Sequence, residues 1–308
     1  MTFMNRTTLI AEVGSNYDGN LGRAIEYIKA AKTCGADIVK FQSLIKEKLV
    51  APRLFSNEGV SDNPVYKGFS NLTLPEEWYP VLKEAADKEQ IEFMSTPFYL
   101  EAVDILERIN VRAFKIASGD ITFTPLLNAV GKTGKRVILS TGGSSLEDVA
   151  RAVDTLKQAG ASDITLLHCV SNYPPQWSEV NLRAMVALKD AFGLPVGISD
   201  HTPGSTIPVA AVALGASVIE KHVTFDRSLP GPDHPFAMTM EEFGEMVRQV
   251  RNLESALGTG EKVPADSEAA KQHRMRRGVY DPDTLEPVRG ESGLWLRPQH
   301  LLTEQDRD

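Results

Sequence analysis

The strongest constraint on the fold of this chain is a dipeptide that recurs between helix-like and strand-like segments. Gly-Ala stands at residues 35–36, 160–161 and 215–216, each time just before a β-branched run. Glycine is common where a helix ends, because the backbone there often turns into the left-handed region. The recurring dipeptide therefore indicates a repeated helix-to-strand unit.

Eight short apolar runs have the character of strands, and the segments between them place apolar residues three or four apart, as helices do. Two helix starts fit a capping box, Ser144 with Glu147 and Thr239 with Glu242. The predicted strands are Thr8–Val13, Asp37–Gln42, Ile91–Thr96, Arg112–Ala117, Arg136–Thr141, Asp163–His168, Val196–Asp200 and Val218–Thr224.

Eight such units within about 250 residues, with nearly continuous apolar strands, predict an α/β fold, a TIM (β/α)8 barrel over residues 1–260. The alternative, a doubly wound sheet, lacks a Gly-x-Gly-x-x-Gly after any strand. Residues 261–308 are too few for a second core and predict a short C-terminal arm, with a strand at Gly293–Leu296. The long polar segment Ser43–Thr73 predicts an active-site cover or a dimer contact.

Charge and composition exclude several classes of partner. The chain has 33 Lys and Arg against 41 Asp and Glu, a net charge of -8, and no cationic tract, which disfavours nucleic acid and anionic membrane surfaces. Its longest apolar run, Pro208–Ile219, is too short to span a bilayer. Cys34 and Cys169 lie in no metal or redox spacing, and Met1–Arg6 shows no signal peptide. We expect a cytoplasmic protein.

Polar side chains collect at the carboxyl ends of the predicted strands, where barrels of this kind carry their chemistry. Lys40 and Lys115 would be costly to desolvate unless an anion meets them. With Ser118 and Ser140 beside them, they indicate a pocket for phosphate, or for phosphate plus carboxylate. Either lysine alone could equally be a structural ion-pair partner.

Two histidines on neighbouring strands, His201 and His222, indicate a divalent metal that keeps positions open for substrate. The alternative for His201 is a cap on the following helix. His168 is interpreted as a packed histidine of the barrel wall. The turn Gly231-Pro232-Asp233-His234 predicts that Asp233 and His234 lie just outside the last strand.

Nine segments, in order across roughly residues 7–260, make the sequence resemble the sialic acid synthase family, which includes synthases of N-acetylneuraminate, legionaminate, pseudaminate and spore-coat polysaccharide. They are Ile10-Ala11-Glu12-Val13-Gly14-Ser15-Asn16, Lys40-Phe41-Gln42, Ser95-Thr96-Pro97-Phe98, Phe114-Lys115-Ile116-Ala117-Ser118-Gly119-Asp120, Ser140-Thr141-Gly142-Gly143, His168-Cys169-Val170-Ser171-Asn172-Tyr173-Pro174, Gly197-Ile198-Ser199-Asp200-His201-Thr202, Ile219-Glu220-Lys221-His222 and Gly231-Pro232-Asp233-His234.

The resemblance implies a metal-dependent condensation of phosphoenolpyruvate with an N-acylated hexosamine, such as N-acetylmannosamine, by a homodimer. It implies that His201 and His222 bind the metal, typically manganese, with Mg²⁺ or Co²⁺ as alternatives. The phosphoenolpyruvate side would comprise Lys40, Thr96, Lys115, Ser118, Ser140, Ser171 and Tyr173. Asp120 would also bind substrate, while Glu12, Gln42, Glu220 and Asp233 would face the sugar, the three carboxylates being the catalytic candidates.

The sequence departs from the family in its C-terminal part. Family members usually continue into an antifreeze-like domain that covers the partner's active site, whereas here we expect only a linker-like segment near residues 276–280 and no complete domain of that kind. Two alternatives therefore stay open. One is a phosphoenolpyruvate-using barrel that acts on a different aldose, and the other is a non-catalytic homologue that binds phosphoenolpyruvate or sugar.

Overall fold

The structure is a computed structural model that describes residues 6–57, 59–69, 72–297 and 299. The chain divides into two compact units, Met1–Leu257 and Gly258–Asp308. The first unit holds the sheet and the long helices, and the second holds four short elements. Each unit is described by itself.

Eight parallel strands form the centre of the first unit, and they run in the order β5-β2-β1-β10-β9-β8-β7-β6. The two strands at the ends of this order, β5 and β6, lie side by side, so the sheet comes round to a nearly closed barrel. The strands are β1 (Thr8–Gly14), β2 (Ile38–Ser43), β5 (Glu92–Pro97), β6 (Ala113–Ile116), β7 (Arg136–Ser140), β8 (Ile164–Cys169), β9 (Val196–Asp200) and β10 (Val218–Thr224).

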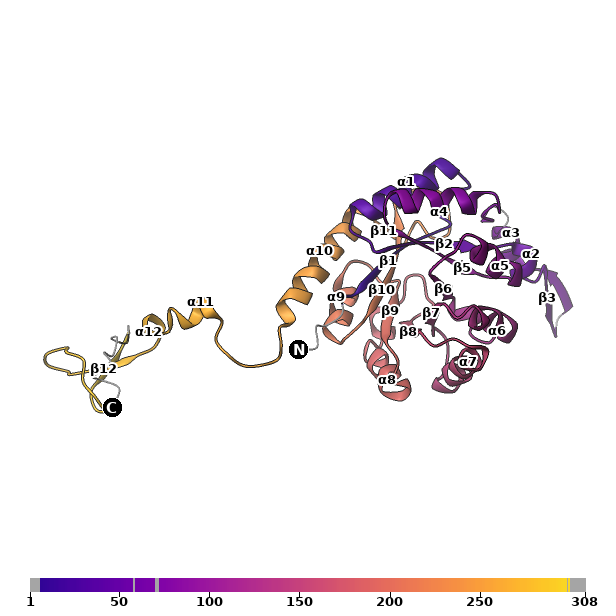
Figure 1. Cartoon of the computed structure of the whole chain (residues 1–308). Helices are drawn as coiled ribbons and strands as arrows, with labels where there is room; N and C mark the ends of the chain where they lie inside the picture. Colours follow the sequence, from indigo (N-terminus) through magenta and orange to yellow (C-terminus); the bar gives the residue numbers. More distant parts are fainter. Residues whose placement is uncertain (1–5, 58, 70–71, 298, 300–308) are drawn as a thin grey trace. The chain divides into compact units, whose positions relative to one another are not determined.

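A helix follows each of these strands, and the helices lie around the outside of the barrel (Figure 1). They are α1 (Leu21–Thr33), α4 (Trp78–Lys88), α5 (Leu100–Arg108), α6 (Thr124–Lys132), α7 (Leu146–Ala159), α8 (Arg183–Phe192), α9 (Thr206–Ala213) and α10 (Met240–Leu257). Their buried apolar faces join the outward strand residues in one large core. Burial on both faces explains why the strands are almost continuously apolar.

A second, small cluster fills the inside of the barrel, with one apolar side chain from each of seven strands. The eighth strand, β9, contributes Gly197, where an added Cβ would lie 2.1 Å from the carbonyl oxygen of Val218. The interior is therefore packed below the carboxyl ends of the strands, and polar side chains have room only at that end. The cluster comprises Ile10, Ile38, Met94, Ala113, Ile138, Leu167 and Val218.

The predicted TIM barrel is confirmed, and each of the eight predicted strands matches an observed strand to within one residue at both ends. The capping box at Thr239 and Glu242 is present. The box predicted at Ser144 is wrong by one residue, because Ser145 caps α7 and Asp148 closes the box. Ser144 with Glu147 and Ser145 with Asp148 have the same offset of three positions, so spacing alone could not distinguish the two pairs.

The segment predicted as a cover or a dimer contact contains short elements of its own. They are α2 (Lys46–Leu49), a hairpin of β3 (Arg53–Ser56) and β4 (Gly59–Asp62), and α3 (Pro64–Gly68). Leu44, Leu49 and Phe69 line the cavity at the barrel mouth. The segment thus covers part of that cavity, while a dimer contact remains a prediction.

The second unit contains α11 (Asp266–Ala269), α12 (Gln272–Met275) and an antiparallel pair, β12 (Gly278–Tyr280) with β13 (Leu294–Leu296). The strand predicted at Gly293–Leu296 corresponds to β13. Within the ranges that the structure describes, no helix combines the length and the apolar character needed to cross a membrane.

Candidate active site

A cavity of about 830 Å³ opens at the carboxyl ends of the barrel strands. Every site residue predicted from the sequence lines it, from six of the eight strands and from the loops that follow β6, β8, β9 and β10. The set is Glu12, Lys40, Gln42, Thr96, Lys115, Ser118, Asp120, Ser140, Ser171, Tyr173, His201, Glu220, His222 and Asp233.

Lys40 on β2 is buried and fully compensated by carboxylates. Its ammonium nitrogen lies 2.7 Å from Glu12 Oε2 and 3.6 Å from Glu220 Oε2, and it donates to Thr96 Oγ1 at 3.1 Å. Burial acts against the charge, but the two carboxylates outweigh it and raise the pKa of Lys40. This lysine is therefore a tightly paired cation.

The charge of Lys115 on β6 is less fully balanced by nearby carboxylates than that of Lys40. Its ammonium nitrogen donates to Ser140 Oγ at 2.5 Å and to the Ile116 carbonyl at 3.0 Å, and its nearest carboxylate oxygen, on Glu220, is 3.9 Å away. Burial lowers the pKa of Lys115, and Glu220 opposes this only in part. Lys115 thus has the capacity to bind a further anion.

Ser140, next to this lysine, leads into a closely packed loop that two further serine hydroxyl groups approach. The backbone N–H of Gly142 donates to Ser118 Oγ at 2.9 Å. A Cβ on Gly142 would lie 2.3 Å from Ser171 Oγ and 2.8 Å from Ser118 Oγ, so only glycine lets the two serines approach this backbone. Together with Lys115, these donors make one side of the cavity suitable for an oxyanion.

The two buried glutamates have opposite electrostatic environments. Burial, together with the charge of Glu220, raises the pKa of Glu12 despite the nearby Lys40. Burial would also raise the pKa of Glu220, but Lys115 and Lys40 outweigh it and lower that pKa. The site therefore pairs one carboxyl group that readily holds a proton with one that stays ionised.

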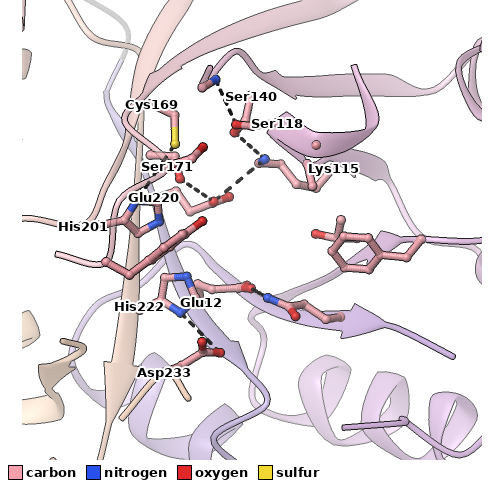
Figure 2. Close-up of a pocket in the computed structure, with 18 of the residues that line it drawn as sticks. Glu12, Lys115, Ser118, Ser140, Cys169, Ser171, His201, Glu220, His222 and Asp233 are labelled. Atoms are coloured by element: carbon pink, nitrogen blue, oxygen red, sulfur yellow. Dashed lines mark hydrogen bonds and ion pairs between the residues drawn. The ribbon is translucent and has the colours of Figure 1, made fainter. Parts of the chain in front are cut away.

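The position of these carboxylates differs from the predicted division between a cationic side and a sugar side. Glu12 and Glu220 were assigned to the sugar side, but both lie against Lys40, and Figure 2 shows Glu220 between Lys115 and the two histidines. The physical reason is that a buried ammonium group needs a counter-charge within reach. The lysines and glutamates therefore form one mixed cluster.

The two predicted metal ligands lie together. The ring centroids of His201 and His222 are 5.4 Å apart, close enough for one ion to contact a nitrogen of each ring at about 2.1 Å. His201 Nδ1 lies 3.1 Å from the Val170 carbonyl and donates to it, which leaves the lone pair of the neutral ring on Nε2. His222 Nδ1 is buried without a hydrogen-bond partner among the described residues.

Both rings are held neutral, as a metal ligand must be. Burial, then the neighbouring His222, lowers the pKa of His201 to about 4. Burial, then Lys40, lowers the pKa of His222 to about 3. In the described part of the chain, no three His, Cys, Asp or Glu side chains converge on a metal position, so a bound ion would take its remaining ligands from substrate or water. The residues present fit an open two-histidine site.

Asp233 reaches the same side of the cavity from the loop after β10. Its Oδ2 lies 3.9 Å from His222 Nδ1 and accepts from the Ser15 hydroxyl at 3.3 Å. As predicted, Asp233 and His234 both lie outside the last strand, but the His234 side chain is fully buried. Of the two residues, only Asp233 lines the cavity.

Several residues near the site were not singled out from the sequence. Ser199 Oγ donates to Glu220 Oε1 at 2.9 Å, and the ring of Phe236 lies 5.0 Å from that of His222. Strand parity could have found Ser199, because it shares a face with Gly197 and His201. No sequence pattern marks Phe236. His168 packs in the barrel wall, as expected, with Nε2 2.7 Å from the Val180 carbonyl.

Comparison with known proteins agrees with this geometry. The chain is 48% identical to an uncharacterised protein of Methanocaldococcus jannaschii, over 89% of this chain and 78% of that one. It is 42% identical to the N,N'-diacetyllegionaminic acid synthase of Legionella pneumophila, over 88% of this chain and 79% of that one.

The barrel superimposes on a solved relative. A crystal structure of the N-acetylneuraminic acid synthetase of Leptospira borgpetersenii in complex with citrate matches with a TM-score of 0.79 and 34% identity, over 87% of this chain and 90% of that one. A profile of the NeuB family matches residues 27–262. The chain therefore belongs to the NeuB family of sialic-acid-type synthases.

Proposed function

We propose that this protein condenses phosphoenolpyruvate with the aldehyde of an N-acylated hexosamine, using a divalent metal ion, to give a nine-carbon 3-deoxy-2-ulosonic acid and phosphate. The observation that carries the proposal is the pairing, in one cavity, of an oxyanion side at Lys115, Ser118 and Ser171 with an open pair of neutral histidines.

The oxyanion side matches phosphoenolpyruvate, which carries a phosphate and a carboxylate. Lys115 has a free capacity for anions, the Ser140 hydroxyl lies 2.5 Å from its ammonium nitrogen, and Ser118 and Ser171 line the same cavity. Charge-assisted hydrogen bonds to phosphate are about twice as strong as neutral ones. Phosphoenolpyruvate bound there would displace Glu220 as the nearest anion to Lys115.

The histidine side matches the sugar aldehyde. A divalent ion held by His201 and His222, with manganese as the first candidate, would supply Lewis-acid polarisation of the aldehyde oxygen. Asp233, next to His222, is placed to accept hydrogen bonds from sugar hydroxyl groups. The aldehyde and the phosphoenolpyruvate would then meet in the middle of the cavity, beside Glu220.

The reaction balances with these residues and water. Carbon 3 of phosphoenolpyruvate forms a bond to the aldehyde carbon, and the aldehyde oxygen gains a proton. Water adds to carbon 2 with loss of a proton, which balances the proton gained by the aldehyde oxygen. The bond from carbon 2 to the phosphate oxygen then breaks as the ketone forms, and the proton lost from the carbon 2 hydroxyl group goes to the departing phosphate. Glu12 and Glu220 are the buried carboxyl groups positioned to exchange these protons.

The apolar side chains that line the cavity favour a sugar with acyl groups. They include Leu44, Leu49, Phe69, Phe98 and Phe236. Apolar walls of this kind bury methyl groups favourably and reject hydroxyl groups that find no partner. The similarity to the diacetyllegionaminic acid synthase of Legionella pneumophila supports the same class of acylamino sugar.

The proposal is tested by incubating the protein with phosphoenolpyruvate and manganese against a panel of sugars, and measuring released phosphate and product mass. The panel contains N-acetylmannosamine, a 2,4-diacetamido-2,4,6-trideoxyhexose, mannose and a phosphosugar. We expect phosphate only with the acylated sugars, loss of turnover after chelation, and recovery with manganese. His222→Ala should abolish turnover.

The other outcomes distinguish the alternatives. Phosphate release with mannose or the phosphosugar, and none with acylated sugars, would indicate a different aldose. Phosphoenolpyruvate binding without release for any sugar would indicate a non-catalytic binding protein. Full activity after chelation, or in His222→Ala, would remove the metal from the proposal.

A further inference from the structure

The side chain of His234 is enclosed by two different loops. It is fully buried, with Nδ1 2.7 Å from Thr224 Oγ1 and Nε2 3.0 Å from Asp18 Oδ1. Thr224 ends β10, whereas Asp18 lies in the turn between β1 and α1. His234 therefore links the loop that follows β10 to the loop that follows β1.

The proton positions on His234 follow from its partners. Asp18 offers only acceptors, so the proton on His234 must face it from Nε2. The Thr224 hydroxyl can then donate to Nδ1, or accept from it if the ring is charged. In both cases the Nε2–H···Oδ1 hydrogen bond to Asp18 is present, and it is charge-assisted.

The turn that receives this hydrogen bond is itself held in one conformation. Asp18 adopts a left-handed backbone with φ +50 and forms an ion pair with Arg23. Asn16 Nδ2 donates to the Val223 carbonyl at 2.9 Å, at the end of β10. The turn after β1 therefore offers a rigid contact surface for the loop after β10.

The same turn also holds the neighbouring residue, Asp233. The backbone N–H and hydroxyl of Ser15 lie 3.5 Å and 3.3 Å from Asp233 Oδ2. The approach is close, because a Cβ on Gly14 would lie 2.6 Å from that oxygen. Asp233 and His234 thus contact the same turn, at Ser15 and at Asp18, and only Asp233 lines the cavity.

We propose that His234 is a positioning residue for sugar binding, which acts by fixing the Asp233 carboxylate beside His222. Its hydrogen bonds to Asp18 and Thr224 hold the loop in place. The anion-binding residues Lys115 and Ser140 lie on β6 and β7, away from this loop, so we expect the effect to be confined to the sugar. The inference rests on the proposed function of the cavity.

The test compares Michaelis constants for the two substrates. His234→Ala is expected to raise KM for the sugar about tenfold, with KM for phosphoenolpyruvate changed less than about twofold. His234→Gln, which keeps a donor toward Asp18, should recover most of the loss. Asp18→Ala should match His234→Ala, and the double variant should be no worse, because the two residues act as a unit.

A matched control separates positioning from general destabilisation. Asp37 is also a carboxylate that links elements, accepting from Leu9 N at 2.9 Å and pairing with Arg251 at 2.9 Å, and it precedes β2 at the other end of the barrel. Asp37→Ala should lower stability with both KM values unchanged. Equal shifts of both KM values in His234→Ala, or an unchanged sugar KM, would overturn the proposal.

A second measurement does not depend on turnover. Hydrogen exchange over residues 225–237 should be faster in His234→Ala than in the unaltered protein, with no change over β2 and β6. Unchanged exchange in that loop would also overturn the proposal. If the unaltered protein releases no phosphate from any sugar, the proposed function fails, and the exchange experiment still decides whether His234 fixes the loop.

Discussion

Asp120 is the acid of the cavity whose ionisation depends most simply on burial. It is 8% exposed, and burial raises its pKa to about 6, with Lys115 opposing this only in part. The carboxyl group therefore binds a proton more tightly in the folded protein than in the unfolded chain, where its pKa is about 3.9. Between these two values the folded state holds more protons, so stability falls as pH rises.

Replacing Asp120 by Asn should remove that dependence. Unfolding by urea at a series of pH values should show the unaltered protein losing about 2–3 kcal/mol relative to Asp120→Asn between pH 4 and pH 8. The difference should be fully developed above about pH 6 and absent below about pH 4. Parallel stability curves for the two proteins would contradict the raised pKa.

Lys40 and Lys115 should respond differently to loss of charge. Lys40 neutralises two buried glutamates, so Lys40→Met should lower the free energy of unfolding by about 3–5 kcal/mol. Among the described residues, Lys115 has one carboxylate within 4 Å, that of Glu220 at 3.9 Å, and Lys40 remains beside that group, so Lys115→Met should fold with a smaller loss of stability. Its main effect should be a ten- to hundredfold weaker binding of phosphoenolpyruvate, since a charged hydrogen bond contributes about 1.5–3 kcal/mol.

Calorimetry of phosphoenolpyruvate binding and urea unfolding, run on both variants, would measure these two effects. The double variant Lys40→Met with Glu12→Gln should recover part of the stability, because it removes the carboxylate left unpaired. The reverse pattern, with Lys115→Met unfolded and Lys40→Met stable, would contradict the roles assigned to the two lysines.

At the scale of the element, strands were predictable and their contacts were not. The predicted bounds of β9 and β10 match the observed ones to the residue, although both strands carry polar side chains within them. Parity also predicted that Glu220 and His222 share a face. It could not show that Lys221, on the opposite face, is 2% exposed and pairs with Asp200. Sequence gives the face of a side chain and not its partner on another strand.

The Lys221–Asp200 pair connects the two strands that carry the histidines. Lys221 Nζ lies 2.6 Å from Asp200 Oδ2 and also donates to the Thr202 carbonyl, so it contacts both neighbours of His201. Lys221→Met should lower the free energy of unfolding by about 3–5 kcal/mol, because it leaves Asp200 buried and unpaired.

The double variant Lys221→Met with Asp200→Asn should be more stable than Lys221→Met alone, since no unpaired charge remains. Urea unfolding of the two variants gives the comparison. If Lys221→Met unfolds at the same urea concentration as the unaltered protein, the pair does not stabilise the junction of β9 and β10.

At the scale of the whole molecule, the set of residues in the site was predictable because the fold brings all strand ends to one rim. Their mutual arrangement was not. The sequence predicts a cationic side that faces a metal-binding side with Glu220 beside the histidines, whereas Lys40 lies between Glu12 and Glu220. That arrangement depends on side-chain reach across three strands, β2, β1 and β10, which strand spacing does not specify.

The division of the chain at Leu257 leads to a final prediction. The large core cluster runs from Leu9 to Val250, and every residue of the cavity lies before residue 237, so the first unit holds its own core and site. A protein ending at Leu257 should therefore unfold within about 2 °C of the full chain and bind phosphoenolpyruvate and manganese with affinities within about twofold. The difference in sugar KM between the truncated protein and the full chain measures the contribution of residues 258–308 to sugar binding. A large loss of thermal stability on truncation would show that the barrel depends on the second unit, and its core would then not be self-sufficient.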